Sequence, residues 1–205
     1  MDRLRARDFT DAMTIGDHTQ QTTQTRSQLR GAALVVATMA TGLMAGVFGL
    51  YANAIMPGLR TTDDRTFVGA FQSIDEAITN PLFLTTFVGA LVIIGVAALL
   101  HLGEGGRPVL PWTVAAFVLY LAVFLVTVRV NVPVNDEIKA AGDPDRIADL
   151  AAVRERFDET RWVRWNIVRT VMATAAFGCL TWALVLHGRT LTRLDRGGSP
   201  GGSRG

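Results

Sequence analysis

Four long stretches of the chain contain no Asp, Glu, Lys or Arg, and polar segments separate them: residues 31–59, 77–103, 108–128 and 170–188. Each has at least 19 residues, close to the roughly 20 helical residues that cross a hydrocarbon layer about 30 Å thick. A buried helix in a soluble protein of this size would rarely stay uncharged for so long. The pattern therefore predicts an all-α integral membrane four-helix bundle, with spans at about 31–56, 81–102, 110–130 and 165–187.

Two longer loops between the spans, 57–80 and 131–164, also contain helical patterns. In the first, one helix face carries apolar residues at spacings of four, three and four: Phe67, Phe71, Ile74 and Ile78. Asp63 or Asp64 could cap this helix, and Asn80-Pro81 ends it and opens the second span. We expect this extramembrane helix to fold over the end of the bundle; lying flat on the lipid surface is the alternative.

The second loop predicts a matching helix. Asp143-Pro144 reads as its N-cap and first residue. One face then carries Ile147, Leu150, Val153 and Phe157. The predicted bundle thus has two loop helices at the same end.

The tails are polar and set the expected orientation. Residues 1–30 and 189–205 lack apolar periodicity, so we expect a disordered and a flexible tail around a membrane domain at 31–188. With four spans both termini lie on one side, where ten basic residues stand against eight on the other side, which also carries twelve acids. This bias favours a multi-pass protein of the cell membrane with both termini in the cytoplasm.

The overall composition excludes several functions. The chain is 49% hydrophobic and 19% charged, and its net charge of +2 makes nucleic acid a poor partner. The single cysteine, Cys179, permits no disulfide within one chain. His101 and His187, at the same ends of two spans, lack a further ligand nearby, so we expect no metal and no cofactor.

Polar side chains gather at one end of all four spans, the end away from the termini: Tyr51, Asn53, Asn80, Thr85, Thr86, Thr127, Arg129, Asn131, Asn135, Trp162, Trp165, Asn166, Arg169 and Thr170. In hydrocarbon an unpaired polar group costs at least about 2 kcal/mol, so these groups should face one another or a wet cavity. Trp162, Asn166 and Arg169 share one helix face. The alternatives are that Arg129 and Arg169 snorkel to the interface and that both tryptophans are interfacial belt residues.

Two further features concern packing. Gly42, Gly46 and Gly49 form a stripe along the first span that would let another helix approach, within the bundle or in a homo-oligomer. Pro133 cannot continue the helical hydrogen bonding, so the third span must loosen there and free backbone carbonyls. Irregular backbone at that depth again indicates a cavity.

Four segments together resemble the anthrone oxygenase-like family of small integral membrane proteins, whose bacterial members are mostly uncharacterised: YANAIMPGL, FQSIDEAITNP, VNVPVN and WVRWNIVRT. The resemblance covers about residues 31–187. It implies oxygenation of an anthrone-type polyphenol to an anthraquinone by O2, without a cofactor. The expected substrate is a hydrophobic small molecule that enters from the lipid bilayer.

In this light the polar residues acquire candidate roles. Arg169 and Asn166 could hold the oxyanion of a deprotonated substrate, with Asn131 and Asn135 as further donors. Candidate substrate-binding residues are Tyr51, Gln72, Asn80, Trp162 and Trp165. No residue stands out as the base, for which Asp136, Glu137 and Tyr51 are candidates. A non-catalytic binding or transport module and an accessory subunit of a membrane complex remain alternatives.

Overall fold

The structure is a computed structural model that describes residues 2–103 and 105–197, and this part of the chain is helical with short connecting turns. In chain order the elements are α1 (Asp2–Leu50), η1 (Tyr51–Ile55), α2 (Met56–Arg60), α3 (Asp64–Ile78), α4 (Pro81–Leu100), α5 (Leu110–Val126), η2 (Thr127–Asn131), α6 (Val132–Ala140), α7 (Leu150–Phe157) and α8 (Glu159–Gly197). Both η elements are single π-helical turns inside longer helices.

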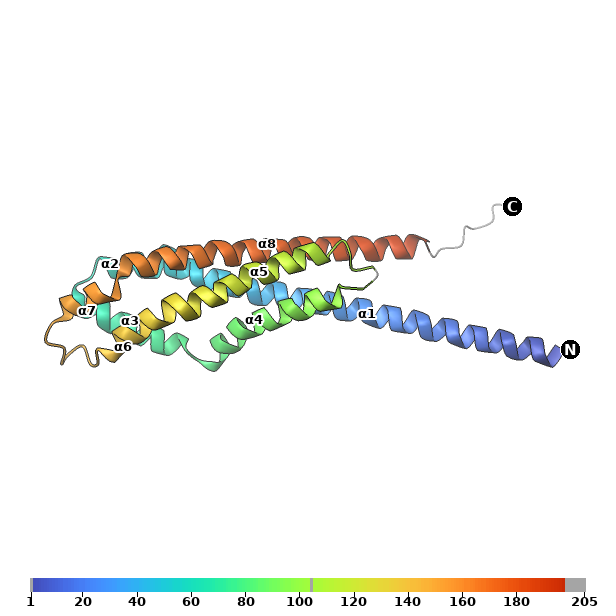
Figure 1. Cartoon of the computed structure of the whole chain (residues 1–205), viewed down its shortest axis with the longest axis horizontal. Helices are drawn as coiled ribbons and strands as arrows, with labels where there is room; N and C mark the ends of the chain where they lie inside the picture. Colours follow the sequence, from blue (N-terminus) through green and yellow to red (C-terminus); the bar gives the residue numbers. More distant parts are fainter. Residues whose placement is uncertain (1, 104, 198–205) are drawn as a thin grey trace.

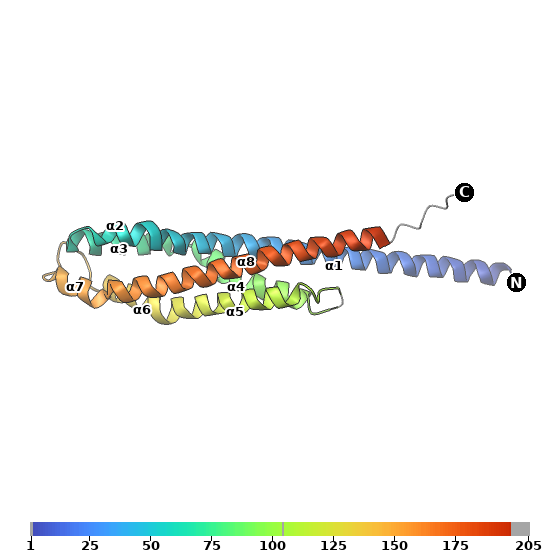
Figure 2. The same cartoon turned by 90° about the horizontal axis from the view of Figure 1, so that it is seen from above.

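Four segments of the described chain are long and apolar enough to cross a membrane: Gln24–Arg60, Pro81–Leu100, Leu110–Ala140 and Leu150–Thr190. α1 packs on α4 and α8, and α5 packs on the same two helices, which closes a four-helix bundle. Both termini lie at one end, and the short helices gather at the other (Figure 1, Figure 2). The predicted all-α membrane bundle is confirmed, and the protein is a multi-pass membrane protein.

Many alanines lie among the larger side chains of the bundle core, and large apolar residues cover its outside, as expected for helices surrounded by lipid. Ala37, Ala90 and Ala173 are fully buried, whereas Leu99 and Val171 are more than 60% exposed. Of the predicted glycine stripe, Gly42 serves close packing within the bundle, whereas a Cβ at Gly46 would meet no atom within 4 Å. A Cβ at Gly42 would lie 2.8 Å from the Phe177 ring, so this position permits the close approach of α1 to α8.

The first loop helix forms as predicted. α3 begins at Asp64, and the Asp63 carboxylate accepts a hydrogen bond from the Thr66 amide at 2.9 Å. This bond lowers the pKa of Asp63. Asn80 caps α4 in the same way, because its Oδ1 accepts from the Phe83 amide at 3.0 Å.

The second loop helix begins later than predicted. The expected start at Asp143-Pro144 is wrong: residues 143–149 form turns, and α7 begins at Leu150 with Asp149 as its cap. The Asp143 carboxylate accepts a hydrogen bond from the Asp145 amide at 3.0 Å, so it closes a local turn instead of capping a helix. Ile147 and Leu150 still pack at the margin of the buried cluster.

α3 and α7 together form what we call the lid, because their apolar faces pack on the end of the bundle and not on lipid. The Phe157 ring lies 4.5 Å from Phe71 and 5.6 Å from Phe67, and it stacks on Trp162 of α8 at 6.3 Å, all between ring centroids. These side chains belong to a buried cluster that also holds Met56, Val134 and Ile138.

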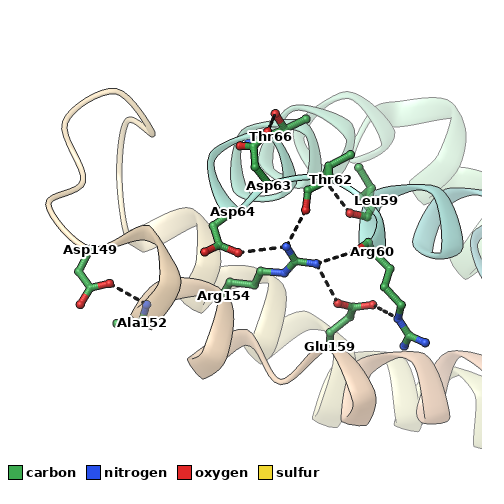
Figure 3. Close-up of polar contacts among 10 residues, drawn as sticks. All are labelled: Leu59, Arg60, Thr62, Asp63, Asp64, Thr66, Asp149, Ala152, Arg154 and Glu159. Atoms are coloured by element: carbon green, nitrogen blue, oxygen red, sulfur yellow. Dashed lines mark hydrogen bonds and ion pairs between the residues drawn. The ribbon is translucent and has the colours of Figure 1, made fainter.

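One arginine ties the two lid helices to each other and to α8. Arg154 on α7 donates to the Thr62 carbonyl at 2.9 Å and the Asp64 carboxylate at 3.1 Å, and its guanidinium lies 4.2 Å from the centre of the Phe67 ring. It also donates to Glu159 of α8 at 3.4 Å, and Arg60 donates to the same carboxylate at 2.7 Å (Figure 3). The lid is therefore held by polar bonds as well as by ring packing.

Several helix ends differ from prediction. The third helix continues through Pro133 to Ala140, and α8 begins at Glu159 and not at 165. α1 reaches back to Asp2 through the segment expected to be disordered, since no proline interrupts a helix once the apolar span has nucleated it. The expected flexible tail is helical to Gly197, and its remainder lies outside the described residues.

The Arg154 contacts make the lid testable. Arg154→Met keeps an apolar stem on Phe67 but removes the bonds to Thr62, Asp64 and Glu159, which should cost about 1–3 kcal/mol. We expect a lower Tm in detergent and faster amide hydrogen exchange in α3 and α7. Arg156→Met is the matched control, because Arg156 is exposed on the same helix. Equal exchange in the two variants would contradict the role of Arg154.

Candidate functional site

A cavity of about 330 Å³ lies at the lid end of the bundle, between α3 and the four long helices. Its wall is mostly apolar and contains five phenylalanines: Phe48, Phe71, Phe83, Phe87 and Phe124. Seven polar side chains interrupt this wall: Tyr51, Asp75, Thr79, Thr127, Asn131, Asn135 and Arg169. An apolar pocket of this size with a few convergent polar groups is typical of a small-molecule site.

The two π-helical turns lie beside this cavity, and each precedes a proline. η1 ends two residues before Pro57, and η2 ends two residues before Pro133. A proline ring clashes with the carbonyl four residues earlier in a regular helix, and the wider turn relieves that clash. The helix thus continues through the proline, and the added residue helps to bring Tyr51 and Asn131 to the cavity wall.

Arg169 is the central side chain of the wall and is only 6% exposed. Its Nε donates to the Asn166 Oδ1 at 3.0 Å, and Nη1 donates to the Thr127 hydroxyl at 3.4 Å. The guanidinium lies 4.6 Å from the centre of the Phe48 ring and 5.3 Å from that of Trp162. Among the described residues no carboxylate lies within ion-pairing distance of it. The site therefore contains a buried cation whose bonds are all to neutral partners.

Asn166 positions Arg169. It is fully buried, and its Nδ2 donates to the Phe48 carbonyl at 3.1 Å while its Oδ1 accepts from Arg169. The Phe48 carbonyl lies just before the π-helical turn η1. The amide thus bridges α1 and α8. Arg169 lines the cavity, whereas Asn166 does not.

Asn131 is the most unusual polar group of the wall. It is 1% exposed, and neither its Nδ2 nor its Oδ1 has a hydrogen-bond partner among the described residues. Leaving a buried amide unsatisfied costs about 1–3 kcal/mol. Because Asn131 lines the cavity, its donor and its acceptor are available to a bound molecule.

A chain of hydrogen bonds runs from Trp162 to the rim of the cavity. The Trp162 indole donates to the Asn135 Oδ1 at 2.7 Å, and Asn135 Nδ2 donates to the Asp75 carboxylate at 2.6 Å. The other oxygen of Asp75 pairs with the Lys139 ammonium at 3.0 Å. Lys139 also pairs with Asp136 at 3.0 Å, so among these charged groups Arg169 is the one without an ion-pair partner in the described residues.

One side of the cavity faces outward through apolar side chains. Leu84 and Val88 on α4, Val128 on η2 and Val132 on α6 line the cavity and are each 39–45% exposed. Their level lies within the segments that can cross a membrane. The cavity therefore opens laterally between α4 and the third long helix, toward the acyl chains.

Three predicted binding residues lie elsewhere. Gln72 donates to the carbonyls of Ile138 and Gly142, so it ties α3 to the end of α6. The Asn80 side chain caps α4 by accepting from the Phe83 amide, and half-buried Trp165 does not line the cavity. Arg129 is exposed, as the snorkelling alternative requires, whereas Arg169 and Trp162 are buried inside the bundle.

Sequence reasoning missed Asp75, the one carboxylate that lines the cavity in the described part of the chain. Of the acids considered as a base, Asp136 is exposed and paired with Lys139, and Glu137 is exposed. A signal was present, because Asp75 lies four residues after Phe71 on the apolar face of its helix.

The opposite end of the bundle holds the His101–His187 pair, with ring centroids 5.7 Å apart. Burial lowers the pKa of His101. Across the described residues, no three His, Cys, Asp or Glu side chains come together as a metal site.

The chain was compared with protein families, curated proteins and solved structures. No curated protein and no solved structure matches the chain. A family model described as anthrone oxygenase matches residues 82–179. The matched segment carries Asn131, Asn135, Trp162, Asn166 and Arg169. This match supports membership of the anthrone oxygenase-like family for the segment from the second to the fourth span.

Proposed function

We propose that the protein is a membrane-embedded oxygenase that converts a hydrophobic, anthrone-type aromatic substrate to a quinone with O2. The observation that carries this proposal is Arg169, a buried cation without a carboxylate in ion-pairing distance among the described residues, on the wall of an aromatic-lined cavity. A cation in this position favours a ligand that is flat, apolar and anionic when it reacts.

The lateral opening supports a substrate that arrives through the bilayer. A tricyclic aromatic dissolves in acyl chains, and the exposed side chains of Leu84, Val88 and Val128 offer it an apolar path. The lid covers the adjacent end of the bundle, so the reacting atoms would be kept from bulk water.

The chemistry requires little beyond removal of a proton and stabilisation of charge. Loss of a proton from the methylene carbon of an anthrone gives a carbanion-enolate, which donates an electron to O2. Recombination gives a carbon-bound peroxide anion, which is protonated and then loses water to form the quinone. One substrate and one O2 thus give one quinone and one water. Arg169 would stabilise the enolate oxygen, and the unsatisfied Asn131 amide would bind the same or a neighbouring oxygen.

The role of Arg169 predicts a large kinetic effect. Arg169→Met should reduce quinone formation about 100–1000-fold, as when an oxyanion donor is lost. Arg129→Met is the matched control, since Arg129 belongs to the adjacent turn η2 but is exposed. Purified protein in detergent would be mixed with a hydroxylated anthrone, with and without air, and followed by quinone absorbance and O2 uptake. Background-level oxidation by the wild type would contradict the proposed function.

We expect Asn131 to lower the stability of the protein and to contribute to turnover. In Asn131→Leu an apolar side chain replaces an amide that lacks partners, so we expect an unchanged or higher Tm. The same variant should lose about tenfold or more of the turnover, because a hydrogen bond to substrate contributes roughly 1.5 kcal/mol. Asn53→Leu, at an exposed position of η1, should retain turnover. A destabilised but fully active Asn131→Leu would show that the amide is structural.

A further inference from the structure

We propose that Asp75 is the general base of this site and that Lys139 positions it at the boundary between the cavity and a groove on the outer surface. This inference rests on the proposed function. It assigns the proton-transfer step to an atom, the carboxylate oxygen of a side chain on the lid.

The first argument is position. Asp75 lies on the inner face of α3, is 7% exposed, and is the one carboxylate lining the cavity within residues 2–103 and 105–197. A base must reach the carbon that loses the proton, and none of the other described acids lines the cavity. Asp136 and Glu137, on the same turn of α6 as Lys139, are exposed.

The second argument is the way the carboxylate is held. One oxygen accepts from Asn135 at 2.6 Å, and the other pairs with Lys139 at 3.0 Å. A carboxylate has about four acceptor positions, so two bonds orient it and leave room for a proton. Asn135 is itself fixed by the Trp162 indole at 2.7 Å. This arrangement resembles a base with an orienting partner, the geometry expected for proton transfer.

The third argument is the charge around it. Lys139 on α6, Arg169 on α8 and the Tyr51 hydroxyl on η1 are the groups that interact electrostatically with Asp75 from the packed elements. Asp136 faces Lys139 from the solvent side at 3.0 Å. Arg169, on the wall of the same cavity, is placed to stabilise the enolate that the proton transfer leaves.

The fourth argument is access to water. A groove of about 540 Å³ lies on the outer side of this ion pair and is lined by Gln72, Glu76, Thr79, Lys139, Gly142 and Asp143. Lys139 thus belongs to the groove and Asp75 to the cavity, while Thr79 lines both. A proton on Asp75 can therefore exchange with solvent through the groove, while the substrate uses the lipid-facing opening.

Asp75 alone can carry out each proton transfer of the reaction. Asp75 takes a proton from the methylene carbon and leaves the carbanion-enolate. After O2 has added, Asp75 returns the proton to the peroxide anion. It then takes the second proton from the same carbon as the O–O bond breaks, and this proton joins the leaving hydroxide to form water. Without O2 only the first step and its reversal remain, so solvent deuterium would enter the substrate.

The test is anaerobic exchange of a hydroxylated anthrone in D2O, followed by mass spectrometry, with the full-length protein in detergent. The wild type should accelerate deuterium incorporation at the methylene carbon over a protein-free blank. Asp75→Asn should lose about 100-fold or more of that acceleration, the usual contribution of a general base. The same variant should still bind the anthraquinone product within about threefold of the wild-type Kd, since its shape is unchanged.

Two further variants separate positioning from folding. Lys139→Met should slow exchange about tenfold and Lys139→Arg much less, because Arg keeps the charge beside the carboxylate. Glu137→Gln, at an exposed acid of the same helix, should exchange like the wild type. Wild-type exchange in an Asp75→Asn variant that binds product would overturn the inference.

The same samples distinguish the two proposals when air is admitted. Exchange without quinone formation would leave Asp75 as the base and contradict the oxygenase. Quinone formation at wild-type rate in Asp75→Asn would leave the oxygenase and remove Asp75 from its role. A wild type that accelerates neither reaction would overturn both.

Discussion

The site depends on a guanidinium held inside the membrane domain without a carboxylate in ion-pairing distance among the described residues. Burying a charge is costly, and neutral hydrogen bonds and ring faces offset only part of that cost. Arg169 receives its support from Asn166, Thr127 and the rings of Phe48 and Trp162, which come from three of the four long helices. Folding thus places a cation where an anionic ligand would gain the most binding free energy. An apolar residue at this position would make the bundle more stable.

Much of the fold could be predicted, because charge-free windows and caps are local properties of the sequence. The four spans follow from the windows, and the starts of α3 and α4 follow from Asp63 and Asn80-Pro81. The failures arose where two local rules compete. Pro133 suggests a helix end, but the π-helical turn before it lets the helix continue to Ala140. Asp143 suggests a cap, but its carboxylate closes a turn on the Asp145 amide.

The site could be predicted only in part, since helix periodicity shows which residues share a face but not which faces meet. The spacing of Asn166 and Arg169 placed both inside the bundle, where they contact each other. Whether a polar side chain hydrogen-bonds to a backbone carbonyl depends on tertiary contacts that the sequence does not show. Gln72 is an example, because its amide donates to the Ile138 carbonyl of α6 and not to the cavity. Asp75 was overlooked because it lies among loop acids, and its burial depends on α3 folding back over the bundle.

The most direct measurement is an experimental structure of the protein in lipid with a hydroxylated anthraquinone bound at a pH where a phenol of the ligand is ionised. The account predicts that the rings lie among the phenylalanines of the cavity, with the ligand oxyanion at hydrogen-bonding distance from Arg169 and a second oxygen near Asn131. A ligand bound elsewhere on the protein, with Arg169 turned toward the acyl chains or paired with a carboxylate of its own chain, would contradict it.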